Sequence, residues 1–536
     1  MKIAFAVGIC ATLLSMMSCS GKGNDVAKAE VTSAPKETTP AAAPVPRAEI
    51  RGVWITNVDS DVLTSHQKIA DAMDALHAAH INVVYPVVWN KAMTMYPSDQ
   101  AASVTGIQID PIYAGRDPLQ EVIIEAHRNG IEVVPWFEYG FAASYNGAGG
   151  LLVEKKPGWK ALDQSGALAT KSNFEWLNSM DPEVREFMAG MILEVAKKYD
   201  VDGIQGDDRL PSLPSIAGYD EKTKALYRAK FGQDPPADPK DKQWVKFRAD
   251  ILTDWLAELR QRVKAVDPSL TISMAPSYYP WALQEYLQDS KAWVDLGLVD
   301  TIHPQAYRKT LPEYQKIIDE LTTTQFSKSQ LPMVAPGLLV KVGPYVITKD
   351  YLLGAIAYNR AHGINGEVFF FYEGLRANND ELLNALKNGP YAEPAALPYR
   401  AVPRRPDGVT FGGFEALPRV DKSMLPDTFR ADLDGHVSEA AVYDVFIRFD
   451  APSKGAKFSL AEDSGKPLKN SGDVVLKGKG IVPGEWISVG NCAVSPDGKQ
   501  HVLLYTPEGV MRGAVDLPMP TVMLLINRKM LPAMTK

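Results

Sequence analysis

The chain has 536 residues, of which 46% are hydrophobic, 9% aromatic and 23% charged. This length is too great for one ordinary core, and the composition is that of a globular protein rather than a disordered or fibrous one. The formal net charge of −7 provides no basic field for phosphates and argues against a nucleic-acid partner, while it is compatible with a neutral glycan.

Residues 1–19 have the pattern of an export signal. Lys2 precedes an almost unbroken apolar run, Ile3–Met17, which is shorter than the roughly 20 residues that a membrane span needs. The end of the run resembles a bacterial lipobox with Cys19 as the lipidated residue, although Met16 replaces the usual leucine. We therefore expect export and a lipid anchor at Cys19, with an ordinary signal peptide cut at a small residue as the alternative.

Residues 20–47 are rich in Ala, Pro, Thr and Lys and read as a flexible tether that cannot bury a core. Ser20, rather than Asp, after the lipidated residue suggests the outer membrane. Of the three cysteines, Cys10 leaves with the signal and Cys19 carries lipid, so Cys492 is left without a partner. The fold therefore depends on its hydrophobic core and not on disulfides.

Residues 48–390 alternate short β-type runs with helical patterns, which is typical of a parallel α/β domain. The expected strands are 51–58, 81–89, 131–139, 201–207, 270–277, 301–307, 332–340 and 367–372. The expected helices include 65–79, 118–129, 182–199, 242–266, 311–324 and 349–362. Helix signals include Asp181-Pro182 at a start, and Gly130 and Gly363 at ends.

Eight such repeats predict a (β/α)8 TIM barrel. A doubly wound open sheet is the alternative, but no glycine-rich phosphate loop follows the first strand. Alternation along three strands supports the barrel, because one face is apolar and the other becomes polar towards the strand end. The loops 91–117, 140–181 and 208–240 are long, which predicts a walled groove on one barrel face.

These long loops carry aromatic residues that could stack on sugar rings, although each one alone more often covers the small core of its own loop. They are Tyr96, Tyr113, Tyr145, Trp159, Trp176 and Tyr219.

Two strand ends carry carboxylates, Glu138 on the third strand and Asp207-Asp208 on the fourth. Glycosidic hydrolysis needs an acid for the departing oxygen and a carboxylate near the anomeric carbon, about 5–5.5 Å apart for retention and about 6.5–9.5 Å for inversion. Aspartate pairs are commonly helix caps or ion-pair partners, so their spacing alone does not identify a catalytic site.

Several ordered segments closely resemble the family-10-like glycosyl hydrolases, over about residues 51–389. They are Arg51–Ser60, Trp136–Tyr139, Trp176–Asn178, Asp181–Arg185 and Val201–Asp208. The resemblance implies a barrel enzyme of the bacterial envelope that cleaves peptidoglycan glycan strands, particularly those stripped of stem peptides.

The fourth strand is also similar to the α-amylase pattern Asp-Gly-Phe-Arg-x-Asp, with Gln205 in the place of the arginine. This similarity implies that Asp207 is the nucleophile or base. The amylase acid ends strand five, but Ser273–Ser277 contains no carboxylate. We therefore expect Glu138 to be the acid, with a pKa raised by an apolar wall or by a neighbouring carboxylate. Asp208 and Glu373 are the alternative candidates for this role.

The residues expected to bind substrate are Asn57, Trp89, Trp136, Gln205, His303, Gln305, Tyr307, Tyr372 and Glu373. Family members usually have a bulky residue where this chain has Gly206, and we expect the glycine to open the pocket.

Metal chemistry is an alternative, because Glu138, Asp207, Asp208 and His303 are possible ligands. No His-x-x-x-His or paired cysteine spacing supports it, and no nucleophile-elbow pattern supports serine hydrolysis. We expect neither a metal nor a cofactor.

A Pro-rich linker is predicted at 391–406, followed by short strands and turns over 407–536 that predict a β-rich accessory domain. We expect this domain to pack on the barrel, with glycan binding as the alternative. For the whole chain, the competing hypothesis is a non-catalytic envelope lipoprotein that grips glycan with a degenerate barrel. Gly206 and the missing acid of strand five favour that hypothesis modestly.

Overall fold

The computed structural model describes residues 47–400 without a break and, beyond them, 408–411, 415–416, 429–434, 437, 440–449, 456–462, 468, 474–476, 486–498, 501–507 and 522–527. The predicted signal peptide, the lipidation site Cys19 and residues 20–46 of the predicted tether lie outside the described residues. Arg47 was expected to end the tether, but it begins the short strand β1 (Arg47–Ala48), which pairs with β18 (Ala395–Ala396).

The region after residue 48 is an α/β fold built on short parallel strands. All eight predicted strands are present. They are β2 (Ile50–Ile55), β3 (Val83–Pro86), the interrupted strand β6 (Glu132–Val133) and β7 (Trp136–Phe137), β11 (Gly203–Gly206), β12 (Thr271–Met274), β13 (Thr301–Ile302), β14 (Gly337–Leu339) and β17 (Gly366–Phe370). The sixth and seventh are shorter than predicted. The sixth ends at Ile302 instead of residue 307, and the seventh starts late because Leu331–Met333 forms a 3-10 turn around Pro332.

The strands pair in two parallel sheets, in the orders β14-β17-β2-β3-β6 and β13-β12-β11-β7. Isolated parallel bridges link the two sheets in two places. One joins Val87 to Trp136, and the others join Ile302 to Val334 and Gln305 to Gly337. Since parallel strands share one polarity, the residues that follow them gather at a common end.

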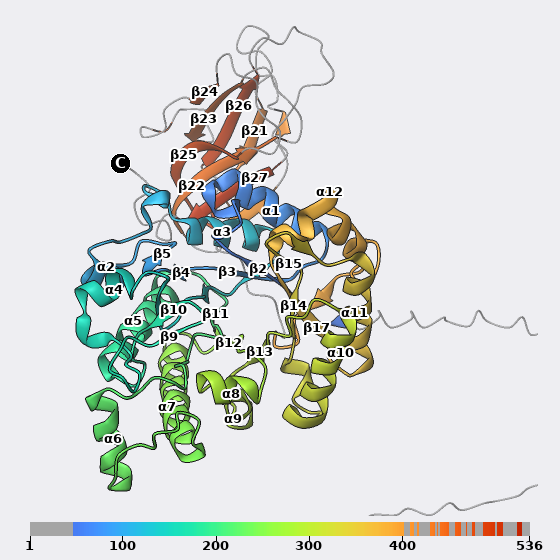
Figure 1. The fold of residues 1–536 in the computed structure, drawn as a ribbon. Coiled ribbons are helices and arrows are strands. Elements are labelled where there is room, and N and C mark those ends of the chain that lie inside the picture. The colour runs from blue at the N-terminus through green and yellow to red at the C-terminus, as the bar shows by residue number, and fades with distance from the viewer. Residues whose placement is uncertain are drawn as a thin grey trace, which may run out of the picture. The chain divides into compact units, whose positions relative to one another are not determined.

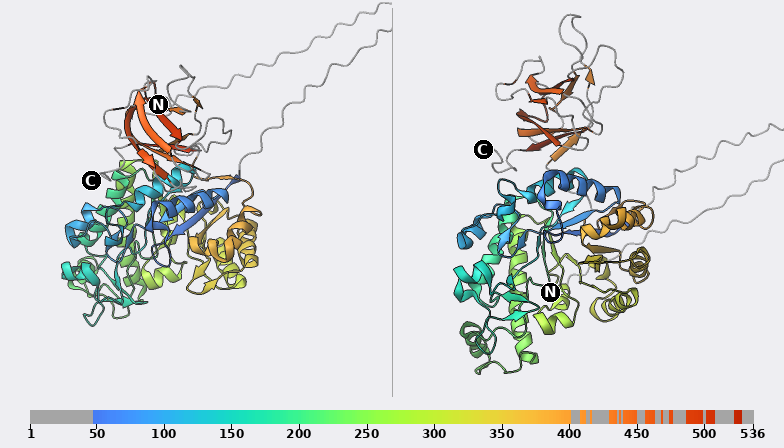
Figure 2. Two further views of the ribbon diagram at one scale, coloured as in Figure 1. Left: turned by 90° about the horizontal axis from the view of Figure 1, so that it is seen from above. Right: turned by 45° about the horizontal axis from the view of Figure 1, so that its top comes forward.

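Helices lie outside these strands (Figures 1 and 2). They are α1 (His66–Ala78), α3 (Pro118–Arg128), α5 (Pro182–Lys198), α7 (Lys242–Val266), α10 (Leu311–Glu320), α11 (Lys349–Ala361) and α12 (Tyr372–Lys387). The predicted start of α5 is confirmed, because the Asp181 carboxylate accepts from the Glu183 N–H at 3.0 Å. Gly130 and Gly363 follow α3 and α11 with φ of 68° and 80°, as expected of helix-ending glycines.

The loops at the carboxyl ends of the strands carry the insertions. The loop after β3 holds β4 (Trp89–Asn90), β5 (Met93–Thr94), α2 (Asp99–Thr105) and the 3-10 turn η2 (Pro111–Tyr113). The loop after β7 holds β8 (Ala142–Tyr145), α4 (Gly150–Lys155), η3 (Pro157–Trp159), β9 (Thr170–Lys171) and β10 (Phe174–Trp176). Later loops add α6 (Glu221–Phe231), α8 (Trp281–Tyr286), α9 (Ser290–Asp295) and the hairpin β15 (Lys341–Val342) and β16 (Tyr345–Val346). Among the described residues, no helix combines the length and the apolar character needed to span a membrane.

The predicted linker begins too early at Tyr391. Tyr391 is fully buried and its hydroxyl contacts the Glu367 carboxylate. Arg400 donates from Nε to Glu132 at 2.6 Å and from Nη2 to the Asp202 carbonyl at 2.7 Å. This stretch therefore packs against the α/β region as far as Arg400.

Beyond residue 407 the described residues form two antiparallel sheets, in the orders β19-β27-β22-β25 and β20-β21-β26-β23-β24. Their strands are β19 (Gly408–Phe411), β20 (Glu415–Ala416), β21 (Phe429–Asp432), β22 (Ala441–Arg448), β23 (Ala456–Glu462), β24 (Val474–Leu476), β25 (Trp486–Val494), β26 (His501–Pro507) and β27 (Val522–Asn527). Side chains from both sheets, including Val445 and Leu460, share one hydrophobic core, and the free thiol of Cys492 is buried there. This part of the chain is β-rich, as predicted.

Candidate active site

Two predicted catalytic carboxylates meet at the carboxyl ends of neighbouring strands. Glu138 follows β7 and Asp207 follows β11, and these strands pair in parallel through Gln205 and Trp136. The same Nη2 atom of Arg209 lies 2.7 Å from Asp207 Oδ2 and 3.5 Å from Glu138 Oε1. Those two carboxylate oxygens are therefore no further apart than the sum of the distances, about 6.2 Å. This limit suits a pair of carboxylates acting on one glycosidic bond.

Arg209 is the centre of the cluster. Its Nη1 lies 3.1 Å from Asp208 Oδ1, so one guanidinium faces three carboxylates. Its Nε donates to the Glu138 carbonyl at 2.9 Å, and its guanidinium carbon lies 4.7 Å from the centre of the Phe174 ring. These contacts hold the arginine in one place beneath an aromatic cover.

The cluster carries more negative than positive charge when all its members are ionised. Burial, followed by the Asp208 carboxylate, raises the pKa of Asp207 well above its usual value. Burial also raises the pKa of Glu138, although Arg209 and a hydrogen bond oppose the shift. Burial alone would lower the pKa of Arg209, but the three carboxylates outweigh it and raise that pKa. A group of this kind can hold a proton at a pH where an isolated carboxyl would have lost it.

The two oxygens of Asp207, which is only 2% exposed, both accept hydrogen bonds. Oδ2 accepts from Arg209 and Oδ1 accepts from Gln305 Nε2 at 2.8 Å. The same Gln305 nitrogen donates to the Ala275 carbonyl at 3.1 Å, which fixes the orientation of the amide. Arg209 and Gln305 are both donors, so their hydrogen bonds favour the ionised form of Asp207, whereas its hydrogen bond with the Asp208 carboxyl opposes that form.

Glu138 has fewer close hydrogen-bond donors than Asp207. Its Oε2 accepts from Asn90 Nδ2 at 2.7 Å, and that nitrogen also donates to Asn57 Oδ1 at 3.2 Å. Its Oε1 has the looser contact with Arg209, at 3.5 Å. This oxygen is therefore the better place for a transferable proton.

Four residues expected to bind substrate lie in the interior. Trp89, Trp136, Gln205 and His303 are at most 2% exposed. Gln205 accepts from Trp54 Nε1 at 2.7 Å and donates to Ser273 Oγ at 2.9 Å. These side chains have no surface for a sugar to touch, so we expect them to support the site from within.

His303 is unsuited to acid or metal chemistry in this setting. Its ring nitrogens contact the Ala335 carbonyl at 2.9 Å and the Tyr85 hydroxyl at 3.0 Å, and burial lowers its pKa to about 4. The ring is therefore neutral at ordinary pH, with both nitrogens engaged.

The remaining predicted residues lie nearer the surface. Asn57, Gln305, Tyr307 and Glu373 are partly exposed, whereas Tyr372 is 7% exposed. The Tyr307 ring lies 5.1 Å from that of Phe370, and burial followed by the charge of Asp207 raises the pKa of its phenol. Tyr307 thus belongs to the acid cluster, while Tyr372 contacts Arg376 on its own helix.

Most of the loop aromatics cover the cores of their own loops. Tyr96, Tyr113, Trp159, Trp176 and Tyr219 are at most 7% exposed. Of the six, Tyr145 has a largely exposed side chain, at 46%.

Gly206 does not open the pocket, contrary to expectation. A Cβ built on it would lie 2.5 Å from both the Leu210 carbonyl oxygen and Met274 Sδ. The space is already filled, so a bulkier residue would require the following loop to move. Gly206 therefore allows the loop to pass close to the strand, and it adds no space for a ligand.

Three residues of the site were not anticipated. Arg209 directly follows the aspartate pair, and a basic residue beside two acids is a signal that could have identified it. Asn90 holds Glu138, and Gln288 Nε2 donates to the Asp207 and Pro211 carbonyls at 3.1 Å and 3.2 Å. No sequence pattern marks these two amides, because loops bring them to the cluster.

Within the part of the chain that the structure describes, no three His, Cys, Asp or Glu residues are arranged to hold a metal ion. The Arg209 guanidinium itself stands among the three carboxylates that were considered as metal ligands.

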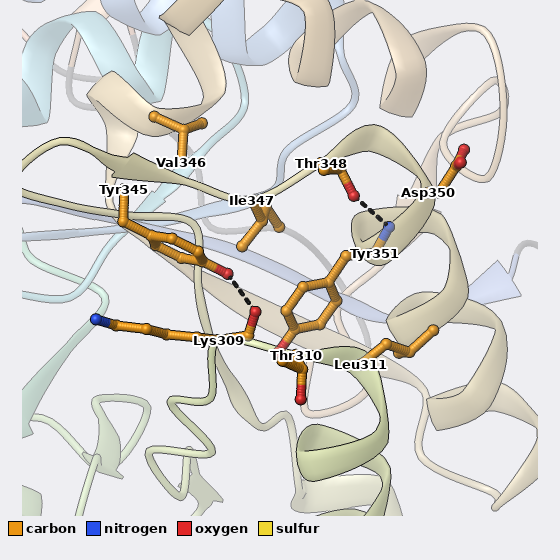
Figure 3. Close-up of a pocket in the computed structure, with 9 residues that line it drawn as sticks. All are labelled: Lys309, Thr310, Leu311, Tyr345, Val346, Ile347, Thr348, Asp350 and Tyr351. Carbon is orange, nitrogen blue, oxygen red and sulfur yellow. Dashed lines mark hydrogen bonds between the residues drawn. The ribbon is translucent and has the colours of Figure 1, made fainter.

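A separate hollow of about 340 Å³ lies between the loops after β13 and β14 (Figure 3). The Tyr345 hydroxyl donates to the Lys309 carbonyl at 2.9 Å, and the Tyr351 hydroxyl donates to the Arg308 carbonyl at 3.0 Å. The two hydroxyls therefore fasten the loop after β13 to the loop after β14 and to the first turn of α11.

Comparisons with known proteins give a consistent result. Residues 49–349 match the model of a family described as glycosyl hydrolase-like 10. The glycosyl hydrolase DigH of Escherichia coli K12 is 25% identical over 339 residues, which are 55% of this chain and 73% of that protein. The glycosyl hydrolase YngK of Bacillus subtilis is 23% identical over 389 residues, 65% of this chain and 73% of that protein. Among solved structures, the glycoside hydrolase domain of PgaB (BpsB) from Bordetella bronchiseptica aligns with a TM-score of 0.49 and 15% identity, over 63% of this chain and 99% of that domain.

Proposed function

This chain belongs to the glycosyl hydrolase-like 10 family, and we propose that it hydrolyses peptidoglycan glycan strands that lack stem peptides. One observation carries the catalytic part of this proposal. Glu138 and Asp207, from two adjacent strands, approach the same nitrogen of Arg209 and lie within the separation that glycosidic hydrolysis uses.

We assign the acid role to Glu138 and the nucleophile role to Asp207. Burial raises the pKa of both carboxyls, that of Asp207 well above its usual value, so the assignment rests on the hydrogen bonds. Both oxygens of Asp207 accept from the donors Arg209 and Gln305, whereas Glu138 has one loosely held oxygen. The limit of about 6.2 Å applies to the two oxygens that face Arg209 Nη2, and it suits two carboxylates acting on one bond. Because Asp207 is the nucleophile in this proposal, we propose retention of configuration at the anomeric carbon.

In this mechanism Glu138 gives its proton to the departing glycosidic oxygen while an Asp207 oxygen bonds to the anomeric carbon. The ionised Glu138 then takes a proton from a water molecule, and that water displaces Asp207 from the sugar. Arg209 and Gln305 keep Asp207 oriented through both steps.

We also propose that the eight strands close into a TIM barrel, which the bridges between the two sheets support. The lipid anchor at Cys19 and the outer-membrane location complete the proposal, because a tethered hydrolase would face the envelope glycan. The β-rich residues 407–536 would serve as an accessory domain.

One observation favours a non-catalytic alternative. The Arg209 guanidinium contacts both Glu138 and Asp207, so it occupies space beside the two oxygens that a sugar would have to approach. A protein that binds glycan without cleaving it needs no access to these carboxylates, so an arginine at this position is compatible with such a protein.

The test is to incubate the protein without its signal and tether with peptidoglycan stripped of stem peptides, and to measure new reducing ends. We expect release from the stripped strands and much less from peptide-bearing peptidoglycan. Binding without release would support the alternative, and release with an inverted anomer, read by proton NMR, would overturn the nucleophile role of Asp207.

A further inference from the structure

An aromatic stack stands on the loop after β12, the strand that lacks the amylase-type acid. The Tyr278 and Trp281 rings lie 5.9 Å apart with only 8° between their planes. The Arg308 guanidinium carbon lies 5.0 Å from the centre of the Tyr278 ring. The stack thus joins the loops that follow β12 and β13.

The stack is next to the acid cluster. Ser277, which precedes Tyr278, forms a parallel bridge with Gln305, and Gln305 donates to Asp207 Oδ1 at 2.8 Å. At the other end of the loop, Tyr286 lies 5.5 Å from the Trp281 ring, and its carbonyl accepts from Ser212 Oγ at 3.1 Å. Burial raises the pKa of Tyr286, its hydrogen bond with Ser172 opposes the shift, and the Asp208 carboxylate adds to it.

Trp281 differs from the aromatics that fill the loop cores. Its side chain is 39% exposed, whereas Trp159 and Trp176 are at most 3% exposed. Trp281 leaves apolar area in water although it also contacts Tyr278 and Tyr286, and this exposed area beside a catalytic cluster points to a ligand. Its ring is also held in place by Tyr278, so little conformational freedom would be lost on binding.

We propose that the Tyr278–Trp281 stack is a sugar-binding platform for a pyranose ring of the glycan that lies beyond the bond being cleaved. The C–H face of a pyranose is apolar and packs on the face of an aromatic ring, while its hydroxyls remain free for water or for Arg308. The platform rests on the proposed function, because its ligand is the same glycan. The loop after β12 thus contributes to glycan binding although it carries no catalytic acid. Long glycan strands should gain more affinity from it than short ones.

The experiment measures binding in the inactive Asp207→Asn background, so that the glycan stays intact. Stripped glycan strands are the probe, and a disaccharide from the same strands is the short probe. Trp281→Ala should weaken binding of the strands about tenfold and leave the disaccharide within about twofold. Trp281→Phe should restore most of the affinity, because it keeps a ring at this position.

A matched control removes similar apolar area elsewhere. Leu296 is 64% exposed in the turn that leads into β13, and Leu296→Ala should bind the strands like its parent. In the active protein, Trp281→Ala should raise KM for strands and leave kcat nearly unchanged, as expected of a contact made equally in the ground and transition states.

Unchanged strand binding in Trp281→Ala would overturn the platform, whatever the hydrolysis assays show. An equal loss in Leu296→Ala would overturn it as well, since the effect would not be specific to the stack. If the parent protein releases no reducing ends but Trp281→Ala still weakens strand binding, the platform stands and the proposed hydrolysis fails.

Discussion

Buried carboxylates are paired with different numbers of arginines at the two ends of the parallel strands. Near the amino ends, Glu49 accepts from Arg51 Nε at 2.9 Å and from two nitrogens of Arg360 at 3.1 Å. Burial alone would raise the pKa of Glu49, but the two arginines outweigh it and lower that pKa. Glu49 also pairs with Arg47 Nε at 2.7 Å, so three arginines contact it. The neighbouring Glu367 is different, because its oxygens are hydrogen-bonded to Tyr391 and Asn359 and burial raises its pKa although Arg360 opposes the shift.

At the carboxyl ends, three carboxylates share Arg209, and burial raises the pKa of two of them. A buried group with surplus charge costs stability, whereas a fully paired one leaves the free energy of folding little changed. The comparison therefore separates Glu49, which several arginines neutralise in a network that holds strands together, from the cluster at the carboxyl ends, where one arginine serves three carboxylates.

After loss of the nucleophile Asp207, the largest expected effect comes from Glu138→Gln. It should lower kcat/KM about 10³-fold, because the amide cannot give a proton to the departing oxygen. The wild-type profile of kcat/KM should fall on its alkaline side as Glu138 loses its proton, and the variant should lack that fall. The same change at the other end, Glu367→Gln, should leave kcat/KM within about twofold, and an equal loss in both variants would erase the contrast.

Arg360→Met tests the other side of the comparison. It leaves Glu49 buried with one arginine fewer, so we expect a loss of about 3 kcal/mol in the free energy of unfolding. Urea titration measures this loss, and the rate of glycan cleavage in the still folded protein should not change. A variant with full stability and lower activity would show that the paired end also serves the reaction.

The strands could be predicted because apolar runs bounded by turn residues recur eight times, and their polarity fixes where Glu138 and Asp207 emerge. The alternation of polar and apolar residues predicts which face of a strand a side chain occupies. It does not predict how deeply that side chain is buried. Gln205 and His303 were expected to line the sugar subsites, but both are fully buried and neighbouring side chains enclose them. The position of Arg209 depends on the turn after β11, whose path follows from packing between distant loops.

A smaller effect is expected for Gln305→Leu, which removes the donor to Asp207 Oδ1 without changing the side-chain volume greatly. Since that hydrogen bond favours the ionised form, its loss should raise the pKa of Asp207 further. The acid side of the kcat/KM profile should move to higher pH, with a loss of about tenfold at the optimum. An unmoved acid side would exclude Asp207 as the group that must be ionised.

The smallest effect concerns the pH dependence of the free energy of unfolding. The contribution of Glu49 should increase with pH, whereas that of Asp207 should decrease. The pKa of Glu49 is lowered by folding, so its contribution is present above its unfolded value of about 4.3 and is lost as pH falls through the folded value. The pKa of Asp207 is raised by folding, so wild-type stability falls as pH rises from about 4 through the folded value. Asp207→Asn should therefore be about 1 kcal/mol more stable than wild type at pH 8, and this advantage should shrink towards pH 4. Parallel urea titrations of the two proteins at both pH values measure the difference, and an advantage that grows on acidification would reverse the assignment.

The most direct measurement is the release of reducing ends from stripped glycan strands by wild type and Asp207→Asn, with urea midpoints recorded on the same samples. We expect the variant to lose activity by about 10⁴-fold or more while its midpoint at neutral pH stays equal or rises. Cleavage by Asp207→Asn at the wild-type rate would contradict the central claim that the carboxylates around Arg209 perform the hydrolysis.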